Sequence, residues 1–196
     1  MTSTAKDDRL VWIDLEMTGL DPGREVILEV ATLVTDQHLE VLAEGPSLVI
    51  HHEGEVLERM IPVVRAMHEK NGLLHRVKES QVTPEQAEQR TLAFIRQHCT
   101  EKSAPLCGNT IWMDRMFLNR QMPSVDAYLH YRVIDVSSIK ELARRWNPAA
   151  LAKAPAKPDS HRALDDIRAS IEELRHYRQA WLETRHGESP AEKRVD

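Results

Sequence analysis

The chain has 196 residues, 41% of them hydrophobic and 29% charged, which is the balance of one folded domain with a buried core. No apolar stretch is long enough to cross a bilayer, and the polar N-terminus has no signal segment. The two cysteines lack CxxC spacing and imply no disulfide framework. We therefore expect a protein of the reducing cytoplasm. The net charge of −5 lacks the basic excess of proteins that follow long polyanions, so a nucleic-acid substrate would have to be short or neutralised by bound metal ions.

The first part of the chain has the alternating pattern of β-strands. The pattern predicts strands over residues 10–15, 26–34 and 41–50. A turn rich in glycine and proline, residues 19–23, separates the first two. Such short connections favour an antiparallel meander.

Helical periodicity begins at residue 84. Thr83 as the cap, Pro84 at the first helical position and Gln86 three residues after the cap are typical of a helix N-terminus. The remaining elements are predicted as a strand over 105–107, a helix over 111–122, a strand over 131–136, and helices over 137–146 and about 160–182. Residues 147–159, rich in proline, alanine and lysine, are predicted to form a mobile loop, and 183–196 a disordered C-terminal tail. This order predicts a single α/β domain over 8–182 with a mixed sheet.

Two carboxylates interrupt the first predicted strand. Asp14 and Glu16 leave the same face of that strand because they are two residues apart. Burying two like charges together is costly unless a cation lies between them, and Mg²⁺ and Mn²⁺ prefer carboxylate oxygens and water. The pair predicts either a metal site open to substrate or a strand end with solvated acids.

Further candidate residues come from two predicted helices. Asp114 lies in the first turn of its helix, where the helix dipole favours an acid, and it is a candidate third ligand facing the strand ends. On the last helix, Asp166 flanks the apolar stripe, whereas Asp165 lies nearly opposite it. His161 precedes Asp166 by five residues and shares no helix face with it, so His161 would reach a site from the loop or the first turn, or else be a surface residue.

The ordered set Asp14-x-Glu16, Asp114 and His161-x4-Asp166 resembles the motifs of the DEDDh 3′→5′ exonucleases. Residues 12–20, 108–110 and 130–142 look like one family among them, oligoribonuclease, and the similarity extends over about 10–181. The resemblance implies an RNase H-like fold, a mixed five-stranded sheet flanked by helices. It also implies a homodimer that cleaves very short RNAs, down to dinucleotides, into 5′-mononucleotides.

The same resemblance implies two Mg²⁺ or Mn²⁺ ions and a role for each acid. Asp14 would bridge the ions, Glu16 and Asp166 would hold the ion that carries the attacking water, and Asp114 would help to hold the other. Metal ions acidify a bound water and stabilise the charge that develops on phosphorus. His161 would act as the general base, because an imidazole with an ordinary pKa of about 6.5 removes a proton near neutral pH.

Residues that select short substrates are also implied by the resemblance. A cap on the terminal 5′-phosphate would consist of one guanidinium and three hydroxyls, from Arg132, Thr110, Ser137 and Ser138. Such a cap satisfies a terminal dianion better than an internal phosphodiester, although Ser137 also suits a helix N-cap. Leu20 would lie between the bases, and Tyr131 would reach the site of the partner subunit. The segment 60–64 lacks the tryptophan of some family members, so base packing there would be aliphatic.

Two other functions fit parts of the pattern. A proofreading or tRNA-trimming exonuclease would use the same catalytic residues on longer chains, but the acidic net charge and the Arg132 and Ser137 pair argue against it. A dinucleotide sensor or RNA-binding scaffold without activity would be expected to lack at least one of the five catalytic candidates, and all five are present.

Overall fold

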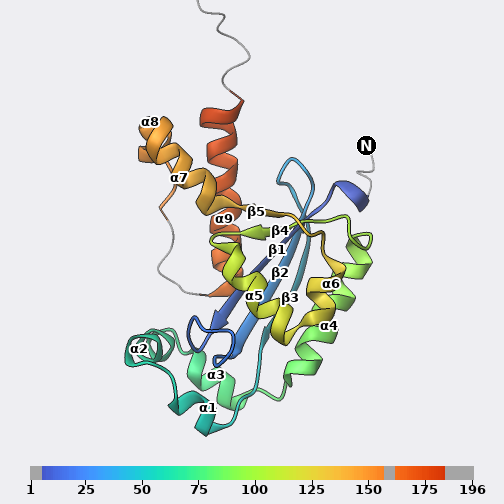
Figure 1. Ribbon diagram of the computed structural model, residues 1–196, viewed down its shortest axis with the longest axis vertical. Helices are drawn as coiled ribbons and strands as arrows, with labels where there is room; N and C mark the ends of the chain where they lie inside the picture. Colours follow the sequence, from blue (N-terminus) through green and yellow to red (C-terminus); the bar gives the residue numbers. More distant parts are fainter. Residues whose placement is uncertain (1–5, 157–161, 184–196) are drawn as a thin grey trace, which may run out of the picture.

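A computed structural model describes residues 6–156 and 162–183. It contains a five-stranded mixed sheet with helices on both faces (Figure 1). The strand order is β3-β2-β1-β4-β5, with bounds β1 Leu10–Met17, β2 Ile27–Thr35, β3 Val41–Val49, β4 Leu106–Gly108 and β5 Val133–Asp135. The first three strands form the expected antiparallel meander, and β4 runs parallel to both β1 and β5.

The other regular elements of the described chain are helices. In chain order they are α1 Gly54–Glu58, α2 Pro62–Lys70, α3 Leu73–Glu79, α4 Pro84–His98, α5 Ile111–Gln121, α6 Pro123–Tyr128, α7 Val136–Trp146, α8 Pro148–Ala152 and α9 Ala163–Tyr177. A 3-10 turn, Lys6–Asp8, precedes β1, and α9 continues as a π-helical segment, Arg178–Leu182. None of the described helices is long and apolar enough to cross a membrane.

The two faces of β1 bury two different cores. Val11, Ile13 and Leu15 face the helices α4, α5 and α6, whereas Trp12 faces α9. All nine residues of β2 are buried, because β2 lies between β1 and β3 and is covered on both faces. The alternation of side chains along β1 therefore determines which residues meet α9.

A glycine allows α4 to approach β3 closely. A Cβ atom on Gly45 would lie 2.6 Å from two ring carbons of Phe94 and 2.9 Å from the carbonyl oxygen of Thr32. The predicted start of α4 is confirmed, with Thr83 and Gln86 forming a capping box.

Several predicted bounds need correction. The loop predicted over 147–159 is wrong at its start, because Pro148 opens helix α8 and the side chain of Asn147 accepts a hydrogen bond from the amide of Ala150. Pro123 likewise begins α6, a helix that the sequence pattern did not predict. The capping residue of α7 is Asp135, whose carboxylate accepts from the amide of Ser137, so Ser137 is not the N-cap.

Candidate active site

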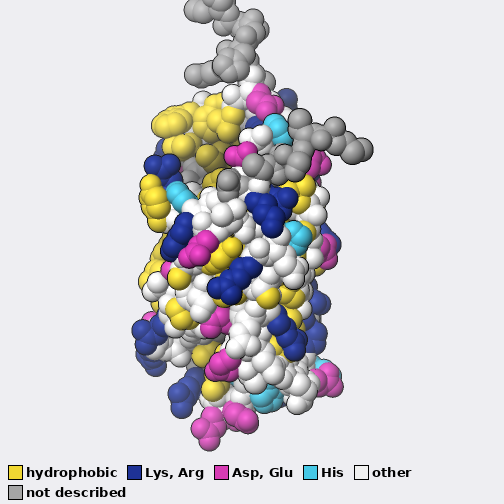
Figure 2. All heavy atoms as spheres, turned by 90° about the vertical axis from the view of Figure 1, so that its right-hand side faces the viewer, with side chains coloured by type: hydrophobic (Ala, Val, Ile, Leu, Met, Phe, Trp, Pro, Cys, Tyr) yellow, Lys and Arg dark blue, Asp and Glu magenta, His cyan; other side chains and the backbone are white. Residues whose placement is uncertain are grey.

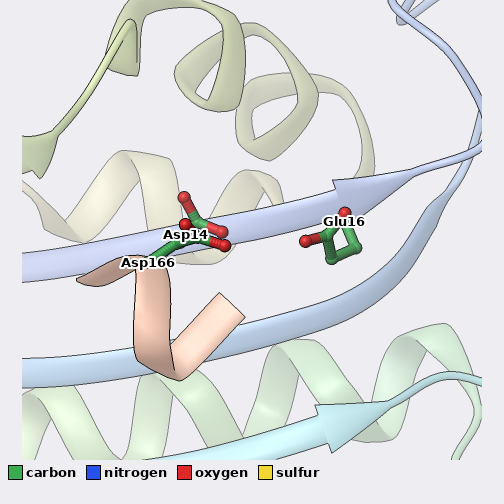
Figure 3. A group of neighbouring side chains, drawn as sticks. All are labelled: Asp14, Glu16 and Asp166. Atoms are coloured by element: carbon green, nitrogen blue, oxygen red, sulfur yellow. The ribbon is translucent and has the colours of Figure 1, made fainter. Parts of the chain in front are cut away.

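Three carboxylates converge where β1 lies beside the first turn of α9 (Figure 3). Asp14 and Glu16 project from the face of β1 that also carries Trp12, and Asp166 extends from α9 toward them. One oxygen atom from each carboxylate lies within 4.8 Å of the others. The structure therefore brings together Asp14, Glu16 and Asp166, three of the five predicted catalytic residues. Asp165 lies on the more exposed side of α9, 3.7 Å from Arg168.

The environment of Glu16 opposes its negative charge. Burial, the largest cause, and the neighbouring carboxylates of Asp166, Glu29 and Asp114 together raise the pKa of its carboxyl group from 4.5 to about 8. Buried like charges of this kind persist only if protons or a cation compensate them. Three convergent carboxylates are hard oxygen ligands, so the residues present fit a divalent ion such as Mg²⁺ or Mn²⁺.

Asp114 lies beside this group but is not part of it. It occupies the first turn of α5, is buried, and accepts a hydrogen bond from the amide of Leu15 at 3.0 Å. Its carboxyl group has a pKa raised from 3.8 to about 7, because the effect of burial outweighs that of the hydrogen bond from Leu15, which lowers the pKa. The bond has a structural reason: β4 pairs with β1 only at Val11 and Trp12, so Asp114 satisfies a β1 amide beyond the end of that pairing.

A histidine approaches the acidic group from α2. His68 is fully buried, its Nε2 lies 2.9 Å from the carbonyl oxygen of Met17, and its Nδ1 lies 3.9 Å from a carboxylate oxygen of Glu16. The sequence alone does not point to His68, because its partners are about fifty residues away in the chain. His161, the predicted general base, lies outside the described residues.

A second polar cluster forms at the ends of β4 and β5. Parallel pairing of Gly108 with Asp135 brings the residues after both strands together. The hydroxyl of Thr110 lies 3.2 Å from that of Ser137, and the amide of Thr110 donates to Ser137 Oγ and Asp135 Oδ1 at 3.0 Å each. Thr110 holds a left-handed backbone conformation with φ of +54°, a strained geometry that is often found at functional sites.

Hydrogen bonds connect this polar cluster to the acidic group. The hydroxyl of Ser137 donates to Asn109 Oδ1 at 3.1 Å, and Asn109 Nδ2 donates to Ser170 Oγ at 2.6 Å. Ser170 in turn donates to the carbonyl oxygen of Asp166 at 2.8 Å. Asn109 and Ser170 were not singled out from the sequence, and only the position of Asn109 in the Gly-Asn-Thr motif pointed to it.

The other predicted substrate residues are exposed around these clusters. Leu20 lies on the β1–β2 loop with 70% of its surface exposed, and Tyr131 is 72% exposed. The guanidinium of Arg132 lies over the ring of Tyr131, 5.3 Å from its centre. Among the described residues, neither Arg132 nor the exposed Ser138 forms a side-chain hydrogen bond to the Thr110–Ser137 cluster.

Comparisons with known proteins agree with this geometry. Residues 11–174 match the family model described as exonuclease. The chain is 55% identical to an oligoribonuclease of Xanthomonas campestris over 90% of this chain and 91% of that one. It is 53% identical to the oligoribonuclease of Halorhodospira halophila, over 88% and 94% of the two chains, and 54% identical to that of Corynebacterium glutamicum, over 91% and 82%.

Solved structures support the fold. The chain superposes on exonuclease I from Methylocaldum szegediense with a TM-score of 0.65 at 20% identity, covering 89% of this chain and 41% of that one. A zinc-bound complex of Escherichia coli exonuclease I with single-stranded DNA gives 0.65 at 14% identity, covering 90% and 41%. The chain thus spans about two fifths of these neighbours, and the likeness confirms the predicted RNase H-like fold.

Proposed function

The chain belongs to the oligoribonuclease family of exonucleases, and we propose that this 3′→5′ exoribonuclease hydrolyses very short RNAs, down to dinucleotides, to 5′-mononucleotides. The observation that carries the proposal is the convergence of Asp14, Glu16 and Asp166 at one end of β1. We assign the activity to residues 8–182, which include the matched exonuclease region.

The acidic group would hold two divalent ions. Asp14 lies close to both Glu16 and Asp166, which suits a bridging ligand. Glu16 and Asp166 would complete one ion site, and Asp114 would contribute to the other from α5. When bound, Mg²⁺ or Mn²⁺ would supply the positive charge that polarises the scissile phosphate and the attacking water.

His161 is the proposed general base. It directly precedes Arg162, whose carbonyl oxygen accepts the amide hydrogen of Asp166 at 3.0 Å. The proposed base is therefore next in sequence to a residue that is hydrogen-bonded to Asp166. An imidazole titrates in the range needed to remove a proton from water near neutral pH.

Substrate length would be selected at the polar cluster. Thr110 and Ser137 present adjacent hydroxyls there, and Arg132 and Ser138 would complete a cap for a terminal 5′-phosphate. Leu20 would contact the bases. The acidic net charge agrees with a short substrate, and on the face drawn in Figure 2 lysine and arginine are interspersed with acids instead of forming one basic tract.

We also propose that the enzyme is a cytoplasmic homodimer in which Tyr131 enters the partner subunit's site. The large exposed fraction of Tyr131 supports a contact outside its own chain. Both cysteines are buried free thiols, which agrees with a reducing compartment.

The decisive experiment compares a 5′-phosphorylated diribonucleotide with a 20-mer RNA, both labelled, in the presence of Mn²⁺. We expect fast release of mononucleotides from the dinucleotide and much slower turnover of the 20-mer. Asp14→Asn should remove nearly all turnover, whereas Asp165→Asn, on the exposed side of α9, should retain it. Preference for the 20-mer would support the longer-substrate exonuclease instead, and a well-folded Asp14→Asn protein with full activity would exclude this site.

A further inference from the structure

We propose that Glu29, held between Arg76 and Arg162, is a positioning residue that sets the spacing between Asp166 on α9 and the Asp14–Glu16 pair on β1. The inference rests on the proposed function, because it concerns the geometry of the same acidic group. It adds ion pairs around the buried Glu29, which lies outside the group of three convergent carboxylates.

Glu29 lies directly beside the acidic group. It pairs with Glu16 in the β1–β2 register, so both side chains leave the same face of the sheet. Only 1% of Glu29 is exposed. A buried carboxylate in this place would repel Glu16 unless another group neutralised it.

Arg76 from α3 supplies that neutralisation. Its two terminal nitrogens lie 3.2 and 3.4 Å from the two carboxylate oxygens of Glu29, and Ser47 from β3 donates to one of those oxygens at 3.2 Å. A two-pronged contact of this kind fixes the carboxylate in orientation as well as in position. Arg76 also opposes the rise in the Glu16 pKa, so its charge reaches the acidic group.

Arg162 connects Glu29 to α9. One of its terminal nitrogens lies 3.7 Å from Glu29, and the residue is the N-cap of α9. Its backbone carbonyl accepts the amide hydrogen of Asp166 at 3.0 Å. The side chain of Arg162 therefore ties the first turn of α9 to β2, while its backbone supports the residue that must face Asp14 and Glu16.

This tie matters because ionised carboxylates in the acidic group repel one another before a cation binds. Repulsion between Asp166 on α9 and the acids of β1 favours movement of α9 away from β1. The attraction of Arg162 for Glu29 opposes movement of α9 away from β1, and it acts at the N-terminus of α9, close to Asp166. Loss of groups that orient metal ligands typically costs about 10- to 100-fold in metal affinity.

The test uses Arg162→Gln in the full chain, with direct Mn²⁺ binding as the main measurement, by electron paramagnetic resonance of the free ion. We expect Mn²⁺ affinity to fall about 10-fold while KM for the diribonucleotide at saturating Mn²⁺ stays within about twofold. Arg162→Lys should recover much of the affinity because it restores the positive charge. Arg168→Gln is the matched control, since Arg168 lies on the same helix but pairs with Glu44 at 2.6 Å.

A double-mutant cycle then isolates the pair. Once Glu29→Gln has removed the acceptor charge, adding Arg162→Gln should weaken Mn²⁺ binding little further. If Glu29→Gln does not fold, the comparison of Arg162→Gln with Arg162→Lys and Arg168→Gln carries the test alone. Equal Mn²⁺ affinity in Arg162→Gln and Arg168→Gln would overturn the inference while the wild type still cleaves dinucleotides. A wild type that neither binds Mn²⁺ nor cleaves would instead overturn the proposed function and the inference with it.

Discussion

The carboxyl groups of Glu16 and Asp114 resist ionisation in the folded chain, and burial is the largest cause for both. Their pKa values of about 8 and about 7 lie above the ordinary 4.5 and 3.8. Between about pH 4 and pH 8, these two groups hold more protons in the folded chain than in the unfolded chain. The free energy of unfolding is therefore greatest at the acidic end of this range and declines as the pH rises toward 8.

We expect the melting temperature of the EDTA-treated protein to fall between pH 5 and pH 8, by about 2 to 4 °C for each kcal/mol lost. Glu16→Gln should flatten this decline because glutamine does not titrate. Saturating Mn²⁺ should also flatten it, since the cation replaces the protons. An equal slope in Glu16→Gln and wild type, measured without metal, would contradict the assignment.

Two threonines of β2 differ in a single hydrogen bond. Thr35 Oγ1 accepts from the indole nitrogen of Trp12 at 3.0 Å, in a fully buried pair. The hydroxyl of Thr32 is also buried but has no hydrogen-bond partner among the described residues.

Thr35→Val should therefore lower the free energy of unfolding by about 1–3 kcal/mol, because it leaves the indole N–H of Trp12 unsatisfied. Thr32→Val should be neutral or stabilising, since it removes a polar atom without a partner. Urea denaturation of both variants provides the measurement. Equal losses of stability would show that the Trp12 bond contributes nothing.

The spacing of residues in the sequence predicted the acidic residues of the site, but it did not predict the residues that hold them in place. The two-residue interval of Asp14 and Glu16 and the helical phase of Asp166 are properties of single elements, so the sequence pattern contains them. Arg76, a partner of Glu29, lies 47 residues away from it, and Ser170, a partner of Asn109, lies 61 residues away. No local pattern predicts such pairs, because they arise only when distant elements pack.

The contact between α4 and β3 depends on the absence of a side chain at Gly45. Gly45→Ala would press a methyl group against the ring of Phe94 and the backbone of Thr32. We expect a loss of about 1–3 kcal/mol in the free energy of unfolding, the usual range for overpacking. Gly54→Ala is the control, because a Cβ there meets nothing within 4 Å. A Gly45→Ala protein as stable as Gly54→Ala would mean that α4 shifts without cost.

Short helices were the elements least visible in the sequence. Helices α1, α2 and α3 have five, nine and seven residues. Isolated helices of this length are unstable in water, so packing of buried residues such as Leu57, Leu73 and Val77 must stabilise them. By contrast, α4 was predictable because its capping box and proline mark its start in the sequence itself.

At the scale of the whole molecule, the mixed five-stranded sheet was predicted correctly because the order of the strands and helices limits the possible topologies. The number of chains in the active enzyme is a separate prediction, which depends on Tyr131.

Mixing two inactive variants tests the dimer. A subunit with Tyr131→Ala should disable the active site of its partner, whereas a subunit with Asp14→Asn should disable its own active site. After subunit exchange, a mixed dimer has one site with intact Asp14 that also receives an intact Tyr131. An equal mixture should therefore recover about a quarter of wild-type turnover, since half of the dimers would be mixed and each would have one working site. Full activity of Tyr131→Ala alone, or no recovery after verified exchange, would contradict the arrangement.

The hydrogen bonds from Ser137 through Asn109 and Ser170 to Asp166 bear on how the enzyme would select RNA by length. In the proposed function, these bonds would hold the polar cluster that takes the terminal phosphate at a fixed distance from the acidic group that cleaves. An RNA whose length does not match this distance could not bind both places at once. Such an RNA would be cleaved more slowly, although the bond to be broken is the same.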